Sequence, residues 1–317
     1  MLAGMGALDN LLTGPHAQGA FLLRLAMTAP WSLSVEDEAP LTIMIALEGR
    51  PWVVADEVAL ELGPGDVCVA KGPEHYLVAD DPSSPVSIVV RPDQRCVSLD
   101  GRSLIDELML GVRTWGNDRD GETQMLVGTY NLDSEVSRRL LAALPRLFLL
   151  RADEWDTSLV HVLEREVSQD RPGQEVILDR LLDLLLISAV RAWFDRHQDE
   201  APGWYAAEDD RAIGSTVRLI HRDPARRWTV AELAREAGMS RAAYARRFGE
   251  LVGEPPMTYL TNWRLTLAAD LLRQPDATVV SVADEVGYAS PYALSAAFKR
   301  VRGVSPREHR RALAAAS

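Results

Sequence analysis

Three arginines, Arg241, Arg246 and Arg247, follow a serine in the last third of this 317-residue chain. A guanidinium carries a rigid fork of N–H donors, which can bind a guanine edge at two points or contact phosphate oxygens. Arg246 has the better position for a guanine, and Arg241 and Arg247 have the better positions for phosphates. These side chains therefore suit recognition of a nucleic acid.

The arginines lie in the first of two copies of one pattern: a short amphipathic helix, a glycine-centred turn, a serine and a second helix. The copies cover residues 228–248 and 278–298, and their serines, Ser240 and Ser290, are 50 residues apart. Two helices joined by a tight turn with Gly are the signature of a helix-turn-helix. One such pattern could arise by chance, but two copies that match position by position are a specific indication of two helix-turn-helix motifs.

In the first copy, Thr229 is expected to cap the first helix, and Glu232 to complete a capping box. Tyr244 and Phe248 recur at i and i+4 in the second helix, so they should pack inward. The opposite face is then exposed at the N-terminal end of that helix, from which this motif contacts bases. That face comprises Arg241, Ala242, Ala245, Arg246 and Arg247.

In the second copy, Leu294 and Phe298 are expected to be buried. The exposed face is expected to comprise Ser290, Tyr292, Ser295, Ala296 and Lys299. A helix over residues 257–274, roughly 27 Å long at 1.5 Å per residue, should join the copies. That length could place the helices starting at Arg241 and Pro291 in two successive major grooves.

The net charge of −12 is unusual for a nucleic-acid binder, but the charge is unevenly distributed. Residues 208–317 hold 17 Lys and Arg against 13 Asp and Glu (+4), whereas residues 1–207 hold 17 against 33 (−16). This asymmetry suggests an acidic regulatory part and a basic contact part. Because the excess is only +4, phosphate contacts should be few and well placed.

The composition, 47% apolar and 25% charged, is that of a globular protein of about two domains. No apolar run approaches the roughly 18 residues of a membrane span, and the first residues show no secretory signal pattern. Two cysteines without a CxxC spacing suit a reducing compartment. We therefore expect a cytoplasmic protein that does not bind membranes.

Residues 20–100 are predicted to form short strands. Apolar segments such as Thr42–Leu47 and Val58–Leu62 alternate with turns rich in Gly and Pro. Many short strands at regular spacing are typical of a β-sandwich or barrel.

Three helices are expected next, over residues 133–144, 156–167 and 175–197. The third is apolar on more than one face, so it should be buried in its own domain or at a dimer interface. Residues 198–203 are polar with Pro and Gly and are the best candidate for a linker.

The segment Leu60-x-Leu-Gly-Pro-Gly-Asp-Val-x-Val69, followed by Gly-Pro-Glu-His75, resembles the second half of a cupin jelly roll. Residues up to about 130 are similar to the cupin-type sensor domains of AraC-type regulators. Cupin enzymes usually have an HxH pair, a Glu and a further His as metal ligands. Only His75 fits that pattern here and no HxH is present, so no metal or other cofactor is expected.

A small barrel can still hold one small molecule, and five residues are candidates for the wall of such a pocket. They are Trp31, Trp52, Cys68, His75 and Tyr76. The alternative is that the aromatic residues belong to the core or the rim. Cys68 and Cys96 are also candidates for an oxidant-sensing thiol, against the alternative that both are buried or idle.

The C-terminal third resembles the AraC/XylS family. The motif Gly-x-x-Pro-x-x-Tyr-Leu-x-x-x-Arg-Leu-x-x-Ala runs from Gly253 to Ala268, and Gly303 and Arg310 stand at further family positions. The resemblance implies a homodimer that binds double-stranded DNA and responds to a small-molecule effector.

One departure from the family concerns the second copy, where Ala296 stands at a position often held by Arg. The first recognition helix should therefore contact most bases. The second should mainly position the protein, through Ser290, Ser295 and Lys299.

Together these features predict an α+β multidomain protein. Residues 1–130 would form a cupin-like β jelly roll with helices appended over residues 131–200, which would mediate dimerisation, and residues 201–317 an all-α domain with two helix-turn-helix motifs. The leading hypothesis is a non-enzymatic, sequence-specific transcription regulator, an effector-responsive activator acting with RNA polymerase. Two alternatives are a cupin-type metal enzyme with an accessory DNA-binding tail and an architectural DNA binder without an effector.

Overall fold

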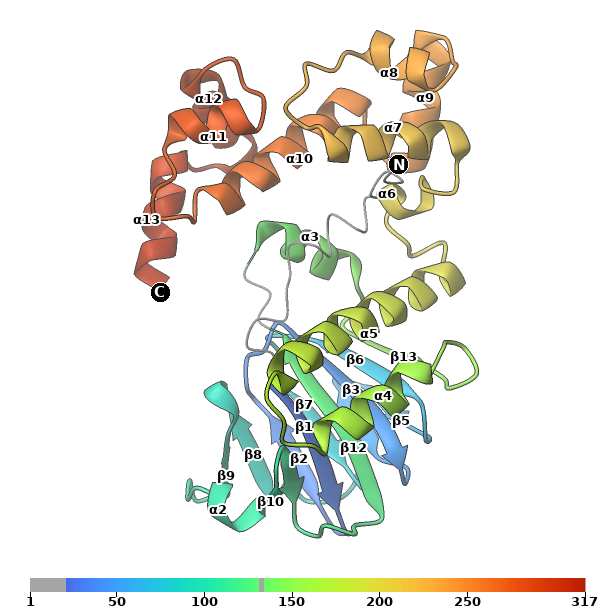
Figure 1. The fold of residues 1–317 in the computed structure, drawn as a ribbon, viewed down its shortest axis with the longest axis vertical. Coiled ribbons are helices and arrows are strands. Elements are labelled where there is room, and N and C mark those ends of the chain that lie inside the picture. The colour runs from blue at the N-terminus through green and yellow to red at the C-terminus, as the bar shows by residue number, and fades with distance from the viewer. Residues whose placement is uncertain (1–20, 131–133, 317) are drawn as a thin grey trace. The chain divides into compact units, whose positions relative to one another are not determined.

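The computed structural model describes residues 21–130 and 134–316, which fall into two compact units (Figure 1). The first unit comprises residues 21–130 and 144–197, and the second comprises residues 134–143 and 198–316. Each unit is thus built from separate stretches of chain. The first is rich in strands and the second is helical, which confirms the predicted α+β multidomain class.

Thirteen strands and four helical segments of the first unit lie within the described residues. The strands are β1 Phe21–Met27, β2 Ser32–Val35, β3 Leu41–Glu48, β4 Trp52–Ala55, β5 Val58–Glu61, β6 Val67–Lys71, β7 Tyr76–Ala79, β8 Ile88–Arg91, β9 Arg95–Val97, β10 Met109–Gly111, β11 Thr114–Gly116, β12 Thr123–Tyr130 and β13 Leu147–Leu150. The helical segments are η1 Pro92–Gln94, α2 Ile105–Leu108, α4 Ser158–Val167 and α5 Gln174–Arg196.

The strands form two sheets that share a core. The seven-stranded sheet has the order β10-β11-β1-β12-β3-β6-β13, and the six-stranded sheet has the order β5-β4-β7-β2-β8-β9. Inward-facing residues of both sheets pack in one cluster, among them Leu25, Met44 and Met125 from the larger sheet and Leu33, Val53 and Val90 from the smaller. The predicted β-sandwich is therefore confirmed. Strand β3 pairs on both edges, and the side chains of its first six residues are buried on both faces.

Strand β13 was not expected from the sequence. Its residues, Leu-Phe-Leu-Leu, begin two residues after Pro145 and pair antiparallel with β6, extending the larger sheet. Helix α5 packs on this sheet: the Tyr130 hydroxyl donates to the Leu182 carbonyl at 2.7 Å, and the rings of Phe148 and Trp193 lie 4.7 Å apart. The chain thus returns from residue 144 to close one edge of the sheet.

The predicted apolar stripes of α5 have two different environments. Leu182, Leu185 and Leu186 are buried in the unit itself, whereas Ile177 and Leu184 are 47% and 49% exposed. The helix therefore has a buried face and a second, partly exposed apolar face.

The second unit consists of helices. They are α3 Glu135–Ala143, α6 Gly203–Ala206, α7 Arg211–Arg222, α8 Val230–Glu236, α9 Arg241–Val252, α10 Pro256–Leu271, α11 Val279–Glu285, α12 Pro291–Arg302 and α13 Pro306–Ala316. The pairs α8–α9 and α11–α12 lie toward opposite ends of α10 (Figure 1). No helix among the described residues has both the length and the hydrophobicity to cross a membrane.

Both helix-turn-helix motifs are present, with the predicted caps. Thr229 and Glu232 form the capping box of α8, with the Glu232 backbone N–H donating to the Thr229 hydroxyl at 3.1 Å. Ser240 caps α9 and Ser290 caps α12, each accepting from the backbone N–H three residues later. These caps satisfy N–H groups that helix starts leave unpaired, which is why the local sequence sufficed to predict them.

Helix α10 joins the motifs and packs against both. It is 16 residues long, about 24 Å at 1.5 Å per residue, somewhat shorter than predicted. Towards the first motif, the Tyr259 ring lies 5.8 Å from Phe248, and the Tyr259 hydroxyl lies 2.6 Å from Nε2 of His221. Towards the second, Leu265 and Ala269 share a cluster that also comprises Val282, Ala283, Val286, Leu294, Ala297 and Phe298.

The two turn glycines have different surroundings. Gly238 has a φ of +67° and Gly287 a φ of +80°, so both adopt the left-handed conformation that side chains disfavour. A Cβ on Gly287 would lie 2.3 Å from the Ala225 carbonyl oxygen, whereas a Cβ on Gly238 would meet nothing within 4 Å. The second turn therefore packs directly on the loop that precedes the first motif.

We predict that Gly287→Ala destabilises the protein more than Gly238→Ala, its counterpart in the other motif. Both variants should lose about 1–2 kcal/mol from the left-handed conformation. Only Gly287→Ala must also displace the backbone at Ala225. Urea unfolding of the full chain measures the difference, and equal free energies of unfolding for the two variants would contradict this packing.

Candidate nucleic-acid interface and sensor cavity

The N-terminal face of α9 is exposed as predicted. Arg241, Ala242 and Arg246 are exposed and Ala245 is partly exposed, while Tyr244 and Phe248 on the other side are buried. Nε of Arg246 lies 3.8 Å from Oε1 of Glu250, one helical turn later, and 77% of the Arg246 side chain is exposed. Such exposed pairs contribute little, so Arg246 can leave Glu250 to contact a base.

Arg247 differs from its neighbours because it already has a partner. Its Nε donates to Oδ2 of Asp210 at 2.8 Å, and the same aspartate caps α7 through the backbone N–H groups of Ala212 and Ile213. These hydrogen bonds and the Arg247 charge hold the pKa of Asp210 below its usual range despite partial burial. The structure thus gives Arg247 a role in joining α9 to α7, beside the predicted phosphate contact.

The corresponding face of α12 carries less charge. Tyr292 is 88% exposed, Ser290 and Ser295 are partly exposed, and Lys299 is exposed. Ala296 stands 50 residues after Arg246 and is exposed too, so this helix has a methyl group where α9 has a guanidinium. The two predicted recognition faces are therefore both accessible and chemically unequal.

Arg264 of α10 connects the motifs. Its Nε donates to the Pro224 carbonyl at 2.7 Å and its Nη2 to the Arg226 carbonyl at 2.8 Å, and its guanidinium lies 5.9 Å from the Tyr288 ring. These contacts fix the loop before α8 and reach the turn of the second motif. The arginine in the family motif thus has a structural role here.

Helix α3 belongs to the second unit although it lies in sequence between two strands of the first. The Asp270 carboxylate of α10 accepts from the backbone N–H groups of Glu135 and Val136 at 2.6 and 3.0 Å. Glu135 also pairs with Arg302 of α12 at 2.7 Å. An acidic side chain of α10 therefore caps α3, an arrangement that the sequence did not reveal. The sequence had placed this helix with the dimerisation segment.

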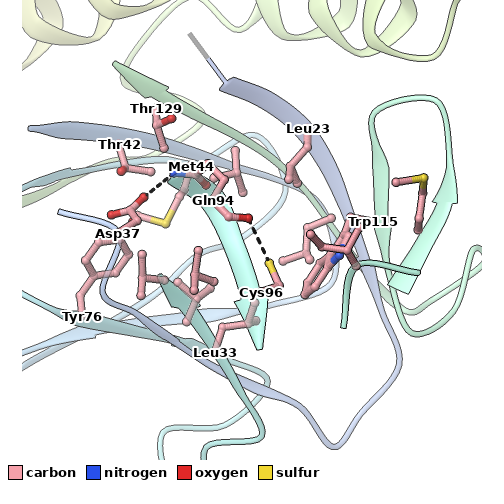
Figure 2. A pocket seen from close by; sticks show the side chains of 17 residues that line it. Leu23, Leu33, Asp37, Thr42, Met44, Tyr76, Gln94, Cys96, Trp115 and Thr129 are labelled. Carbon is pink, nitrogen blue, oxygen red and sulfur yellow. Dashed lines mark hydrogen bonds between the residues drawn. The ribbon is translucent and has the colours of Figure 1, made fainter. Parts of the chain in front are cut away.

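A cavity of about 240 Å³ lies between the two sheets of the first unit (Figure 2). Both sheets contribute apolar residues to its wall. The wall also includes Asp37, Thr42, Tyr76, Gln94, Cys96 and Thr129. The volume is slightly below the range of about 300–1,000 Å³ typical of pockets for drug-sized molecules, which favours a small ligand.

Only Tyr76 of the five predicted effector residues lies in this wall. Trp31 and Cys68 are buried in the core, Trp52 is partly buried, and His75 is exposed. The prediction missed most cavity residues because the wall combines strands of both sheets that are far apart in the sequence, and because strand β12 was not recognised. The period-two alternation of Val127 and Thr129, and of Met44 and Thr42, was the available signal.

The two cysteines have environments that disfavour a reactive thiolate. Burial raises the pKa of Cys68 far above its ordinary value, and burial raises the pKa of Cys96 to about 11. A thiol needs a lowered pKa and access to act as a nucleophile at neutral pH. Oxidant sensing by Cys68 or Cys96 stays a prediction that this geometry does not support.

The described residues hold no group of three or more His, Cys, Asp or Glu placed to bind a metal ion. His75, the predicted fit to the cupin ligand pattern, is an exposed residue whose backbone carbonyl accepts from Arg146 at 3.0 Å.

Both parts of the chain match known families. Residues 6–195 match a family described as Cupin, and residues 233–312 match a family described as Helix-turn-helix domain. A Streptomyces lividans protein named as an AraC-like transcription regulator is 33% identical over 313 residues, 97% of this chain and 98% of that protein. The HTH-type transcriptional regulator AlkR of Acinetobacter baylyi is 32% identical over 96% of this chain and 99% of its own length.

A third relative and two solved structures cover different shares of the chain. The RCS-specific HTH-type transcriptional activator RclR of Escherichia coli is 31% identical over 198 residues, 60% of this chain and 69% of that protein. The DNA-binding domain of AdpA in complex with a target DNA is 36% identical, with 32% of this chain and 91% of that chain covered and a TM-score of 0.31. ToxT from Vibrio cholerae is 14% identical over 93% of this chain and 97% of that chain, with a TM-score of 0.35.

We predict that Asp270→Ala loosens α3. Loss of a helix N-cap costs about 0.5–2 kcal/mol. The backbone amides of α3 should then exchange with solvent hydrogen about 2- to 30-fold faster in the full chain. Hydrogen exchange measured by mass spectrometry tests this, with Asp276→Ala as the control because Asp276 is exposed on the loop after α10. Unchanged exchange in α3 would show that Asp270 does not hold it.

Proposed function

Because the chain belongs to the AraC-like family of transcription regulators, we propose that α9 and α12 enter successive major grooves of double-stranded DNA and that α9 makes most of the base contacts. The observation that carries this proposal is the pair of capped, outward-facing helices on one connecting helix, α10. Bases are contacted from the N-terminal end of the second helix in this motif. The protein would act in the cytoplasm, where its DNA lies.

The division of labour between the motifs follows from their exposed side chains. Arg241 and Arg246 on α9 can donate to phosphates and to a guanine edge. On α12, Ser290 and Lys299 offer phosphate contacts, and Tyr292 offers an apolar ring. Contacts to phosphate fix position but carry no sequence information directly, so α12 would mainly set the register of α9 on the duplex.

The first unit would make this binding depend on an effector in its cavity. A wall that is apolar with a few convergent polar groups is the usual form of a small-molecule site. The name of the Escherichia coli relative contains the words transcriptional activator, which supports activation as the output here, through contact with RNA polymerase.

We predict that Arg246→Ala lowers affinity for the best DNA site by about 10- to 100-fold and weakens the preference for one base pair. Lys299→Ala should instead weaken binding evenly across sequences and reduce the salt dependence by about one charge. The DNA sites are those that the wild-type chain selects from a random pool, and affinities are measured by titration at several salt concentrations. Arg165→Ala removes the same charge from the first unit and serves as the control.

An unchanged base preference in Arg246→Ala would exclude α9 as the main source of sequence recognition. A wild-type chain that selects no DNA sequence from the pool would exclude the proposed function itself.

Homodimerisation is the second part of the proposal, with a second copy as the partner of the exposed face of α5. Ile177, Leu181 and Leu184 follow the i, i+4, i+7 spacing of a helix–helix seam. Ile177 and Leu184 remain about half exposed, although the other face of α5 is fully packed. Two copies of this stripe could bury each other around a two-fold axis.

We predict that Leu184→Glu converts the dimer to a monomer, because it places a charge in the apolar seam. Val176→Glu is the matched control, since Val176 is 64% exposed on the same helix but outside the stripe. Sedimentation velocity gives the mass of each variant. A Leu184→Glu protein that stays dimeric would place the interface elsewhere.

A further inference from the structure

The cavity between the sheets is apolar on one side and polar on the other (Figure 2). Leu23 and Trp115 lie on one side of the view. Asp37, Thr42 and Thr129 lie on the opposite side. A molecule that fills the cavity should therefore have an apolar body and one polar end, because each unpaired buried polar group carries a cost.

Asp37 is held in place by two hydrogen bonds. Its Oδ2 accepts from Nε2 of Gln94 at 2.8 Å, and its Oδ1 accepts from the backbone N–H of Ala39 at 3.1 Å. Gln94 has a φ of +57°, a left-handed conformation that is uncommon for a residue other than glycine. Such outliers persist where the surroundings hold them and often lie at ligand sites. The position of the carboxylate is therefore set before any ligand binds.

Hydroxyl groups surround the same end. Thr42 of β3 and Thr129 of β12 are direct partners across the two antiparallel strands, and both are nearly buried. Tyr76 of β7 also lies in the wall, from the opposite sheet. Threonine and tyrosine oxygens can accept hydrogen bonds, so this end offers several acceptors around one carboxylate.

Asp37 has no positively charged partner within 4 Å among residues 21–130 and 134–316. The neighbouring Glu36 does have one, since Arg91 pairs with it at 2.5 Å. A carboxylate beside an apolar wall gains from a cation that also donates hydrogen bonds. The excess of 16 negative charges over residues 1–207 also favours a cationic ligand, because it attracts cations and repels anions.

From this arrangement we infer that the cavity binds a small apolar amine, with the ammonium group on Asp37 and the hydrocarbon part against the wall near Leu23 and Trp115. The inference rests on the proposed effector site and names the chemical class of its ligand. An ammonium group has three N–H donors, which match the Asp37 carboxylate and the hydroxyls of Thr42 and Thr129. Asp37 is then the residue that determines specificity.

Two other ligand classes fit this end less well. A carboxylic acid would be ionised at neutral pH and would meet the Asp37 charge at close range. An alcohol could use the hydroxyl groups but would leave the carboxylate without a counter-charge. The order of affinity at pH 7 should therefore be amine, alcohol, acid.

The test uses three probes of one length, 1-hexylamine, 1-hexanol and hexanoate, with the full chain at pH 7. Calorimetric titration should show that hexylamine binds at least about tenfold more tightly than hexanol, as expected for a charge-assisted hydrogen bond. Hexanoate should bind most weakly. Asp37→Asn should bring hexylamine and hexanol to equal affinity, whereas Glu57→Gln, an exposed charge change in the same unit, should keep the difference.

A second variant tests whether the probes bind in this cavity, without a change of charge. Val127→Phe fills the cavity from β12 and should abolish binding of both hexylamine and hexanol. Hexanol that binds as tightly as hexylamine, or an amine preference that survives Asp37→Asn, would overturn the inference. Binding of both probes to Val127→Phe would also overturn it, since they would then bind outside this cavity.

Binding to the selected DNA site is measured on the same samples. DNA binding together with no amine preference would reject the ligand class alone and leave the proposed regulator intact. Absence of any selected DNA site would reject the proposed function, whichever probe the cavity prefers. A near-UV circular dichroism spectrum and a cooperative thermal transition like those of the wild type show that the first unit is folded in Asp37→Asn and Val127→Phe, and a Val127→Phe protein that lacks them is replaced by Val127→Leu.

Discussion

Burial of α10 on two sides holds the second unit together. Tyr259 packs on Phe248 of the first motif, Trp263 stacks on His221 of α7, and Leu265, Ala268 and Ala269 join the core of the second motif. Burial lowers the pKa of His221 to about 3, so the imidazole stays neutral where it stacks on Trp263 and meets the Tyr259 hydroxyl. One rigid helix of about 24 Å therefore fixes two recognition helices, a useful spacing for a duplex whose turn is about 34 Å.

Local chemistry explains why so much of the second unit could be predicted from the sequence. Thr229, Ser240 and Ser290 each satisfy a neighbouring backbone N–H, and these contacts involve residues within three positions of one another. Tyr244 and Phe248 follow a helical period that identifies the buried face. Sequence signals between residues three or four positions apart do not depend on the rest of the fold. They correctly gave the caps, the turns and the exposed face of each recognition helix.

The first unit and the candidate cavity depend on pairings far apart in the sequence, so less of them was predictable. The polar end of the cavity brings Asp37 to Gln94, 57 residues later, and Thr42 to Thr129. Tryptophan and cysteine often line ligand pockets, but in this fold Trp31 and Cys68 are buried in the hydrophobic core between the sheets. Arg247 is a similar case: it lies on the predicted face, but its bond to Asp210 spans 37 residues and was not visible in the local pattern.

The capping of α3 by Asp270 limits how this protein can be divided or recombined. A hybrid regulator made by joining residues 1–197 of this chain to another helix-turn-helix domain would carry α3 without the carboxylate that caps it. The reciprocal hybrid would retain a half-buried aspartate without its two N–H donors, and burial already raises the pKa of this carboxyl. Exchange of sensor and DNA-binding parts between relatives would therefore succeed most readily where α3 and the facing turn of α10 are inherited as a matched pair.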